Sequence, residues 1–121
     1  MKIGHEQISA SIEAADAFHN KILSRTDATE KAIKSGMTPA SAGRYIDSMC
    51  NILSGRQYKS TISADAINSI LAYISKKYGD ERLNAAILAV RMHLDYYSAL
   101  PNGGPMRSAC SVINKYETPI P

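Results

Sequence analysis

The sequence has little of what membrane proteins, secreted proteins and disulfide-bonded proteins contain. It has no tryptophan, one phenylalanine and two cysteines, and no stretch approaches the roughly 20 apolar residues that span a membrane. Glu6, Glu13 and Asp16 stand where a signal peptide needs an apolar run. Cys50 and Cys110 each stand among apolar neighbours at helical spacing, which favours buried thiols over a disulfide. We therefore expect a cytoplasmic protein without a membrane partner.

The motifs of common catalytic sites are also missing. His5, His19 and His93 fall on three different predicted elements, and neither cysteine has a partner at a metal-binding spacing. Nucleophile motifs, Walker loops and dinucleotide fingerprints are absent, and the Gly103-Gly104 pair lies between two prolines and follows a predicted helix. The sequence therefore predicts no catalytic residue, no metal and no cofactor, and a function other than that of an enzyme.

The chain is long enough for one ordinary hydrophobic core and too short to suggest two. Its 121 residues are 45% hydrophobic and 21% charged, which predicts a single domain over residues 1–121 or the N-terminal part of a longer protein. The net charge is +3. Residues 1–31 hold four Lys/Arg and five Asp/Glu, a charge of −1, whereas residues 32–121 hold ten and six, a charge of +4. This basic excess permits an anionic partner.

Apolar residues recur at helical spacing along most of the chain and predict an all-α fold, a compact bundle of five to six helices. The first helix is expected over residues 6–24, with Phe18 or His19 and then Ile22 on its apolar stripe. Residues that start or stop helices recur between the later stripes. They are Asp27 and Gly36 for the second helix, Thr38, Pro39 and Gly55 for the third, Ser63 and Gly79 for the fourth, Asp80 and Pro101 for the fifth, and Pro105 for the sixth.

Residues 32–46, AIKSGMTPASAGRYI, have the pattern of a helix-turn-helix corner. Such corners place a small residue in the first helix, a glycine at the turn, and small or apolar residues in the second helix. Ala32, Gly36, Met37, Ala42 and Tyr45 occupy these places in that order. Gly36 can adopt the positive φ of the turn, and the two alanines permit a close approach of the helices. The pattern predicts a corner whose second helix is placed to meet DNA.

The outward face of that second helix carries one basic residue, Arg44. Asp47 on the same face would repel phosphate, so a packed corner without DNA contact stays an equally open interpretation. The loop that follows, GRQYKSTI, is basic and aromatic, and its Arg56 and Lys59 are expected to anchor phosphates while Arg44 and Ser41 lie at the groove. The candidate nucleic-acid-binding residues are Thr38, Ser41, Arg44, Arg56, Tyr58 and Lys59.

About half of the chain, from Ser41 to Tyr97, resembles a helical domain that precedes the catalytic part of some bacterial HNH-type and other restriction endonucleases. The resemblance rests on the order of short elements: Tyr-Ile, a methionine followed by Gly and Tyr, Thr-Ile-Ser, Tyr-Gly and His-Leu-Asp-Tyr-Tyr. It implies a DNA-targeting module of a bacterial or phage restriction-modification or defence nuclease, with a nuclease domain as partner. The short helices with a basic turn are also similar, more loosely, to the core-binding domain of tyrosine recombinases, which clamps duplex DNA.

Tyrosines in the last three predicted helices permit an alternative function. Tyr96 and Tyr97 are consecutive, and consecutive helical residues point about 100° apart, so one of them is expected at the rim or exposed. Together with nearby methionines, such tyrosines suit a protein partner or a homodimer interface, although tyrosines can equally cover a core with their hydroxyls in water. The residues concerned are Tyr73, Tyr78, Met92, Tyr96, Tyr97, Met106 and Tyr116.

Overall fold

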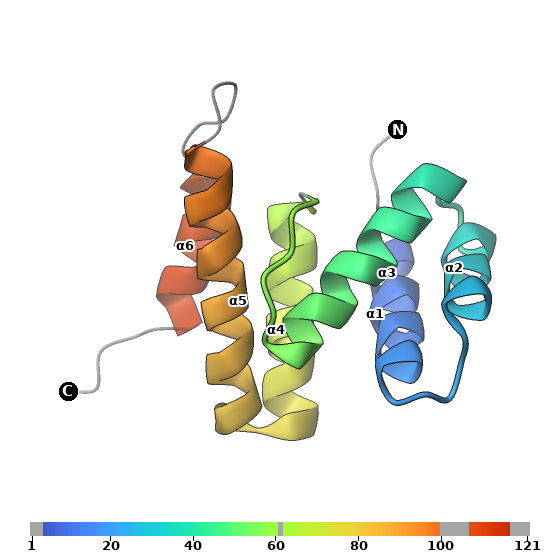
Figure 1. The fold of residues 1–121 in the computed structure, drawn as a ribbon, viewed down its shortest axis with the longest axis horizontal. Helices are drawn as coiled ribbons and strands as arrows, with labels where there is room; N and C mark the ends of the chain where they lie inside the picture. Colours follow the sequence, from blue (N-terminus) through green and yellow to red (C-terminus); the bar gives the residue numbers. More distant parts are fainter. Residues whose placement is uncertain (1–3, 61, 100–106, 117–121) are drawn as a thin grey trace.

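The computed structural model describes residues 4–60, 62–99 and 107–116, and these residues form helices joined by short connections (Figure 1). No strand occurs in these ranges, which confirms the predicted all-α class. The helices are α1 (His5–His19), α2 (Arg25–Lys34), α3 (Pro39–Ser54), α4 (Ala64–Tyr78), α5 (Asp80–Ser98) and α6 (Arg107–Tyr116).

The helices form two groups that lie side by side. α1, α2 and α3 pack against one another, and α4, α5 and α6 form the second group. Figure 1 shows α3 running obliquely from the outer end of α2 toward α5, which it contacts, while α1 contacts α4. Buried side chains from all six helices belong to one continuous apolar cluster. The two groups therefore share a core, and α3 is the helix that bridges them at the surface.

The predicted ends of α3 and α4 are confirmed by the local hydrogen bonds. Thr38 Oγ1 accepts a hydrogen bond from the Ser41 amide at 3.2 Å, and Pro39 takes the first helical position, where the missing N–H costs nothing. Gly55 ends α3 in the left-handed conformation, with φ 72°. Ser63 caps α4 by accepting from the Ala66 amide at 3.1 Å.

The N-terminal helices differ from the prediction at their ends. α1 stops at His19 rather than at residue 24, because Lys21 takes a positive φ of 62° and turns the chain toward α2. Ile22 is consequently 75% exposed and does not belong to the apolar stripe of α1. Ser24, not Asp27, caps α2, since the Ser24 hydroxyl accepts from the Asp27 amide. Asp27 lies instead in the first turn, where its charge favours the positive end of the helix dipole.

Several smaller expectations can also be placed. Cys110 is exposed and Cys50 is half-buried, so the expectation that both are buried is wrong for Cys110, whose position on α6 faces away from α4 and α5. Gly79, the expected stop of α4, follows its last residue with a positive φ of 91° and an extended ψ, unlike the left-handed Gly55. The expected stop at Pro101, the start at Pro105 and Met106 lie outside the described residues. Within the described helices, none is long and apolar enough to cross a membrane.

Candidate nucleic-acid interface

The corner between α2 and α3 has the close geometry that the sequence predicts. Gly36 has a φ of 117°, which glycine adopts without strain. Ala32 and Ala42 are both fully buried, and Met37 is 4% exposed, with the Ser11 hydroxyl of α1 at 3.3 Å from its sulfur. α1 thus closes the open side of the corner, and α2 and α3 are held in a fixed relation to it.

The outward face of α3 begins with small side chains. Pro39 and Ala40 are exposed, Ser41 and Gly43 are half-buried, and Arg44 extends from the same end of the helix into solvent. A helix with small residues at its start can bring its backbone close to a partner. Pro39 has no N–H and the Ser41 N–H is bonded to Thr38 Oγ1, so the Ala40 N–H is the one left in the first three helical positions. The Thr38 hydroxyl, already an acceptor for the helix cap, retains its proton for donation. This end of α3 can therefore approach an anionic surface.

Asp47, which the sequence analysis treats as a repelling charge, has a cationic partner. The Arg25 guanidinium donates two parallel hydrogen bonds to its carboxylate, from Nε to Oδ1 and from Nη2 to Oδ2, both at 2.8 Å. Gly43 lies beside this pair, and a Cβ there would lie 3.4 Å from Arg25 Nη2. Arg25 and Asp47 stand at equal sequence distances on either side of Gly36, so pairing of the helices across the turn could have indicated the contact.

Arg44, Arg56 and Lys59 are all exposed, as a contact with phosphate requires. Within the described part of the chain, none of the three forms an ion pair with a carboxylate. The Lys59 ammonium lies 5.7 Å from the centre of the Tyr96 ring, and Arg56 Nη2 is 3.4 Å from Ser54 Oγ. The structure therefore leaves the three cations at the surface, with Arg56 and Lys59 against neutral groups.

The spacing of these cations along α3 is comparable with the width of a DNA groove. Arg44 and Ser54 are separated by about 15 Å along the helix at 1.5 Å per residue, and Arg56 follows directly after the helix. The major groove of B-DNA is about 12 Å wide. The two arginines therefore lie toward opposite ends of α3, at a separation comparable with that width.

Tyr58 does not belong to this surface, and its prediction as a nucleic-acid contact is wrong. It is 2% exposed, and its ring stacks on the His93 ring with 4.2 Å between centroids. His93 Nδ1 donates to the Tyr58 carbonyl oxygen at 2.8 Å. Burial raises the pKa of the Tyr58 hydroxyl. In an extended loop alternate residues face opposite ways, so Tyr58 anchors the loop to α5 while its neighbours point outward.

The tyrosines of the alternative function form internal contacts. The Tyr73 and Tyr78 hydroxyls donate to Asp16, and the Tyr116 hydroxyl donates to the Asn68 carbonyl oxygen at 3.3 Å. Tyr96 and Tyr97, of which one was expected at the rim, are both half-buried. The Tyr97 ring lies 6.2 Å from that of His93. The described tyrosines therefore leave no continuous aromatic face to solvent.

Comparisons with known proteins return no matching family, no matching curated protein and no matching solved structure. In the ranges that the structure describes, no group of three or more His, Cys, Asp or Glu is placed to hold a metal ion. The charges and contacts of this surface are therefore the features that bear on function.

Proposed function

We propose that this chain is a non-enzymatic module that binds duplex DNA, with the start of α3 at a groove and the loop after α3 on the phosphates. Arg44 and Ser41 are the groove residues, and Arg56 and Lys59 are the phosphate anchors. Thr38 contributes its hydroxyl proton at the start of the helix. Phosphate contacts of this kind supply most of the affinity of such proteins, and base contacts supply the specificity.

The observation that carries this proposal is the pairing of Arg25 with Asp47. Asp47 is the one acidic residue between Glu30 and Asp65, a stretch that holds five Lys/Arg. Its two hydrogen bonds to Arg25 neutralise it in place. Without that pair, a carboxylate would lie between Arg44 and Arg56 and oppose the approach of phosphate. With it, α3 and the following loop present a surface of net positive charge.

The biological setting forms the second part of the proposal. The resemblance of residues 41–97 to a domain that precedes restriction endonuclease catalytic parts supports a role as the DNA-targeting module of a cytoplasmic bacterial or phage defence nuclease. A nuclease domain is then the expected partner. A homodimer or another protein partner remains the alternative from the sequence, and no contact among the described tyrosines favours it.

The proposal predicts DNA binding that depends strongly on salt. Three to five phosphate contacts give a slope of about −3 to −4 in a plot of log affinity against log salt concentration. Fluorescence anisotropy with a mixed-sequence duplex measures this slope. The double change Arg56→Ala and Lys59→Ala should weaken binding to all sequences and reduce the slope by about 2. Lys76→Ala, which removes an exposed cation of α4, is the matched control and should leave the slope unchanged.

Two outcomes would contradict the proposal. One is the absence of binding at about 50 mM salt, where phosphate contacts are strongest. The other is an equal loss from the double change and from Lys76→Ala, because this would assign any binding to overall charge rather than to the loop after α3.

A further inference from the structure

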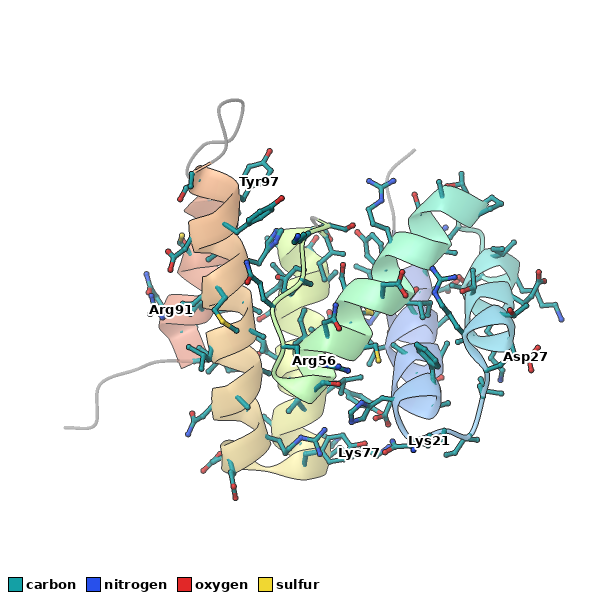
Figure 2. The ribbon with its side chains drawn as sticks, in the orientation of Figure 1. Lys21, Asp27, Arg56, Lys77, Arg91 and Tyr97 are labelled. Carbon is teal, nitrogen blue, oxygen red and sulfur yellow. The ribbon has the colours of Figure 1, made fainter. Side chains whose placement is uncertain are left out.

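A second group of cations gathers where α1 and α3 end and α5 begins. Figure 2 shows Arg56 at the lower end of α3, with Lys77 and Lys21 beneath it. His19 is the last residue of α1, Ser54 is the last residue of α3, and Arg82 lies in the first turn of α5. We refer to Arg56, Ser54, His19 and Arg82 as the Arg56–Arg82 cluster.

Three contacts join the two arginines of this cluster through neutral groups. Arg56 Nη2 is 3.4 Å from Ser54 Oγ, Ser54 Oγ is 3.1 Å from His19 Nδ1, and His19 Nε2 is 3.3 Å from Arg82 Nη2. Arg82 Nη2 also donates to the Leu53 carbonyl oxygen at 2.8 Å, near the end of α3. Side chains from α1, α3 and α5 therefore link the two guanidinium groups in one chain of hydrogen bonds.

These contacts fix the protonation of His19. A guanidinium only donates, so His19 Nε2 must accept from Arg82 and carries no proton. The proton lies on Nδ1, which donates to Ser54 Oγ, while the Ser54 hydroxyl donates to the Cys50 carbonyl oxygen at 2.9 Å. Burial lowers the pKa of His19, and the charges of Arg82 and Arg56 lower it further against the opposing charge of Asp16. The ring between the arginines is thus neutral.

Asp16, the carboxylate whose charge acts on His19, is not available to these arginines. Asp16 is 3% exposed and accepts hydrogen bonds from Tyr73 at 2.6 Å, Tyr78 at 2.5 Å and Asn20 at 3.1 Å. Lys77 completes its set of donors as an ion pair. In the described residues, neither arginine of the cluster pairs with a carboxylate. Asp80 and Glu81 share the first turn of α5 with Arg82 but form no ion pair with it. The charges of Arg82 and Arg56 both act on His19, and a bound anion would relieve their mutual repulsion.

Arg82 is also oriented for a ligand. Its guanidinium carbon lies 4.4 Å from the centre of the Tyr78 ring, so the ring supports one face of the group. The two hydrogen bonds of the cluster both use Nη2. Nε and Nη1 take no part in these two hydrogen bonds, and each can donate a single hydrogen bond to a phosphate oxygen.

We propose that the Arg56–Arg82 cluster binds one phosphate group, with Arg82 as the oriented donor and Arg56 as the exposed arm that closes on it. The phosphate can belong to the DNA backbone or to a free phosphate compound, and the two sources share this chemistry. In the first case the inference rests on the proposed function and adds a phosphate contact beyond the end of α3. In the second case Arg82 belongs to a site for a free phosphate compound, and Arg56 serves both that site and the contact with DNA.

Inorganic phosphate is the probe that tests the site itself. A titration at constant ionic strength, followed by NMR signals of the His19 ring and the Arg82 side chain, should show saturable shifts. Arg82→Gln and Arg56→Gln should each weaken the apparent affinity about tenfold or more, the loss expected for one charge-assisted hydrogen bond. Lys21→Gln removes an exposed cation outside the cluster and should change the affinity less than about twofold, since Lys21 adds only a screened field.

The stability of Arg82→Gln needs its own control, because Arg82 also binds the Leu53 carbonyl oxygen. Arg56 is exposed, so Arg56→Gln keeps the fold and tests the site even where Arg82→Gln unfolds. Two results would overturn the proposal. One is the absence of saturable shifts up to about 50 mM phosphate, since this excludes even millimolar affinity. The other is an equal effect of Arg56→Gln and Lys21→Gln.

Duplex DNA then identifies the source of the phosphate. A loss of DNA affinity in Arg82→Gln, together with a loss of phosphate binding, supports a contact with the backbone. A loss of phosphate binding with unchanged DNA affinity supports a site for a free phosphate compound. Arg44→Ala lies outside the cluster and should leave phosphate binding intact, so a failure of the proposed function at Arg44 can be told from a failure of this site.

Discussion

At the scale of single residues, Asp47 decides whether the outward face of α3 can approach an anion. Its two hydrogen bonds to Arg25 are of the bidentate kind, but both side chains are half-exposed. An exposed ion pair of this type contributes about 0 to 1 kcal/mol to stability. Its main effect on the molecule is therefore electrostatic, because it removes the one acidic charge from that stretch of the surface.

This effect gives a test with an internal control. Arg25→Ala should weaken DNA binding, since it leaves the Asp47 carboxylate unpaired beside the phosphates. Adding Asp47→Asn should restore binding toward the original affinity, because the pair and the double variant have the same net charge. Anisotropy measures both. If the double variant binds as weakly as Arg25→Ala, Arg25 itself contacts DNA and the pairing is not the deciding feature.

A change at Arg44 should show whether this residue recognises the DNA sequence or only the charge of the backbone. Arg44 is the basic residue at the start of α3. The variant Arg44→Ala should lose about 1 to 3 kcal/mol of binding free energy on a preferred sequence, the contribution of a bidentate base contact. On random DNA the loss should be smaller, that of one phosphate contact. Competition binding on a selected sequence and on random duplex measures the difference. Equal losses on the two would make Arg44 a phosphate anchor.

At the scale of elements, the sequence predicts the parts of the fold that depend on local chemistry. Helix ends can be predicted from the sequence where a few neighbouring residues determine them, as at the caps Thr38 and Ser63 and at the final Gly55. The end of α1 could not be predicted in this way, because Ile22 continues the apolar pattern although the chain already turns at Lys21. Side chains that meet across helices carry no such local signal.

At the candidate nucleic-acid interface, too, local features could be predicted from the sequence and contacts between distant residues could not. The exposure of Arg44, Arg56 and Lys59 follows from helical and loop patterns, and the structure confirms it. The burial of Tyr58 follows from stacking on His93, which lies 35 residues away in the chain. Arg82 joins the surface only because α5 begins beside the ends of α1 and α3. Contacts between residues so far apart in the sequence depend on tertiary packing, which the periodicity of the sequence does not encode.

The corner itself is tested by a change at its turn. A side chain at Gly36 would be strained at φ 117°, and its Cβ would lie 2.8 Å from Gln7 Nε2 of α1. Gly36→Val should therefore destabilise the protein by more than about 1 kcal/mol. Denaturant unfolding measures this. In a Gln7→Ala background the same change should cost less, because the clash is removed and the backbone strain remains. An unchanged stability in Gly36→Val would contradict the corner geometry.

At the scale of the whole molecule, two polar networks join the helix groups around the shared core. Asp16 of α1 accepts from Tyr73, Lys77 and Tyr78 of α4, and the Arg56–Arg82 cluster joins α1, α3 and α5. Burial alone raises the pKa of Asp16, but the hydrogen bonds from Lys77 and the two tyrosines outweigh it, so the net pKa is lowered. The stability that Asp16 contributes is therefore present above the ordinary carboxyl range and is lost as pH falls through its lowered pKa.

His19 and His93 make the stability depend on pH in a second range, above that of Asp16. Burial lowers the pKa of both His93 and His19 below the ordinary value of 6.5, with the Tyr58 carbonyl opposing it at His93. The unfolded chain therefore binds more protons than the folded one just below that value, so stability rises with pH there. We expect the melting temperature to fall as pH is lowered from about 7 to 5, a range in which Asp16 stays ionised in the fold.

His93→Phe tests this assignment, because it keeps a ring against Tyr58 and removes the group that titrates. It should lower the melting temperature at neutral pH through loss of the hydrogen bond to the Tyr58 carbonyl oxygen, and it should flatten the fall between about pH 7 and 5. Thermal unfolding followed by circular dichroism at several pH values measures both effects. A variant curve that runs parallel to the wild-type curve over this range would show that His93 is not the source of the pH dependence, and His19 would then be the histidine to change next.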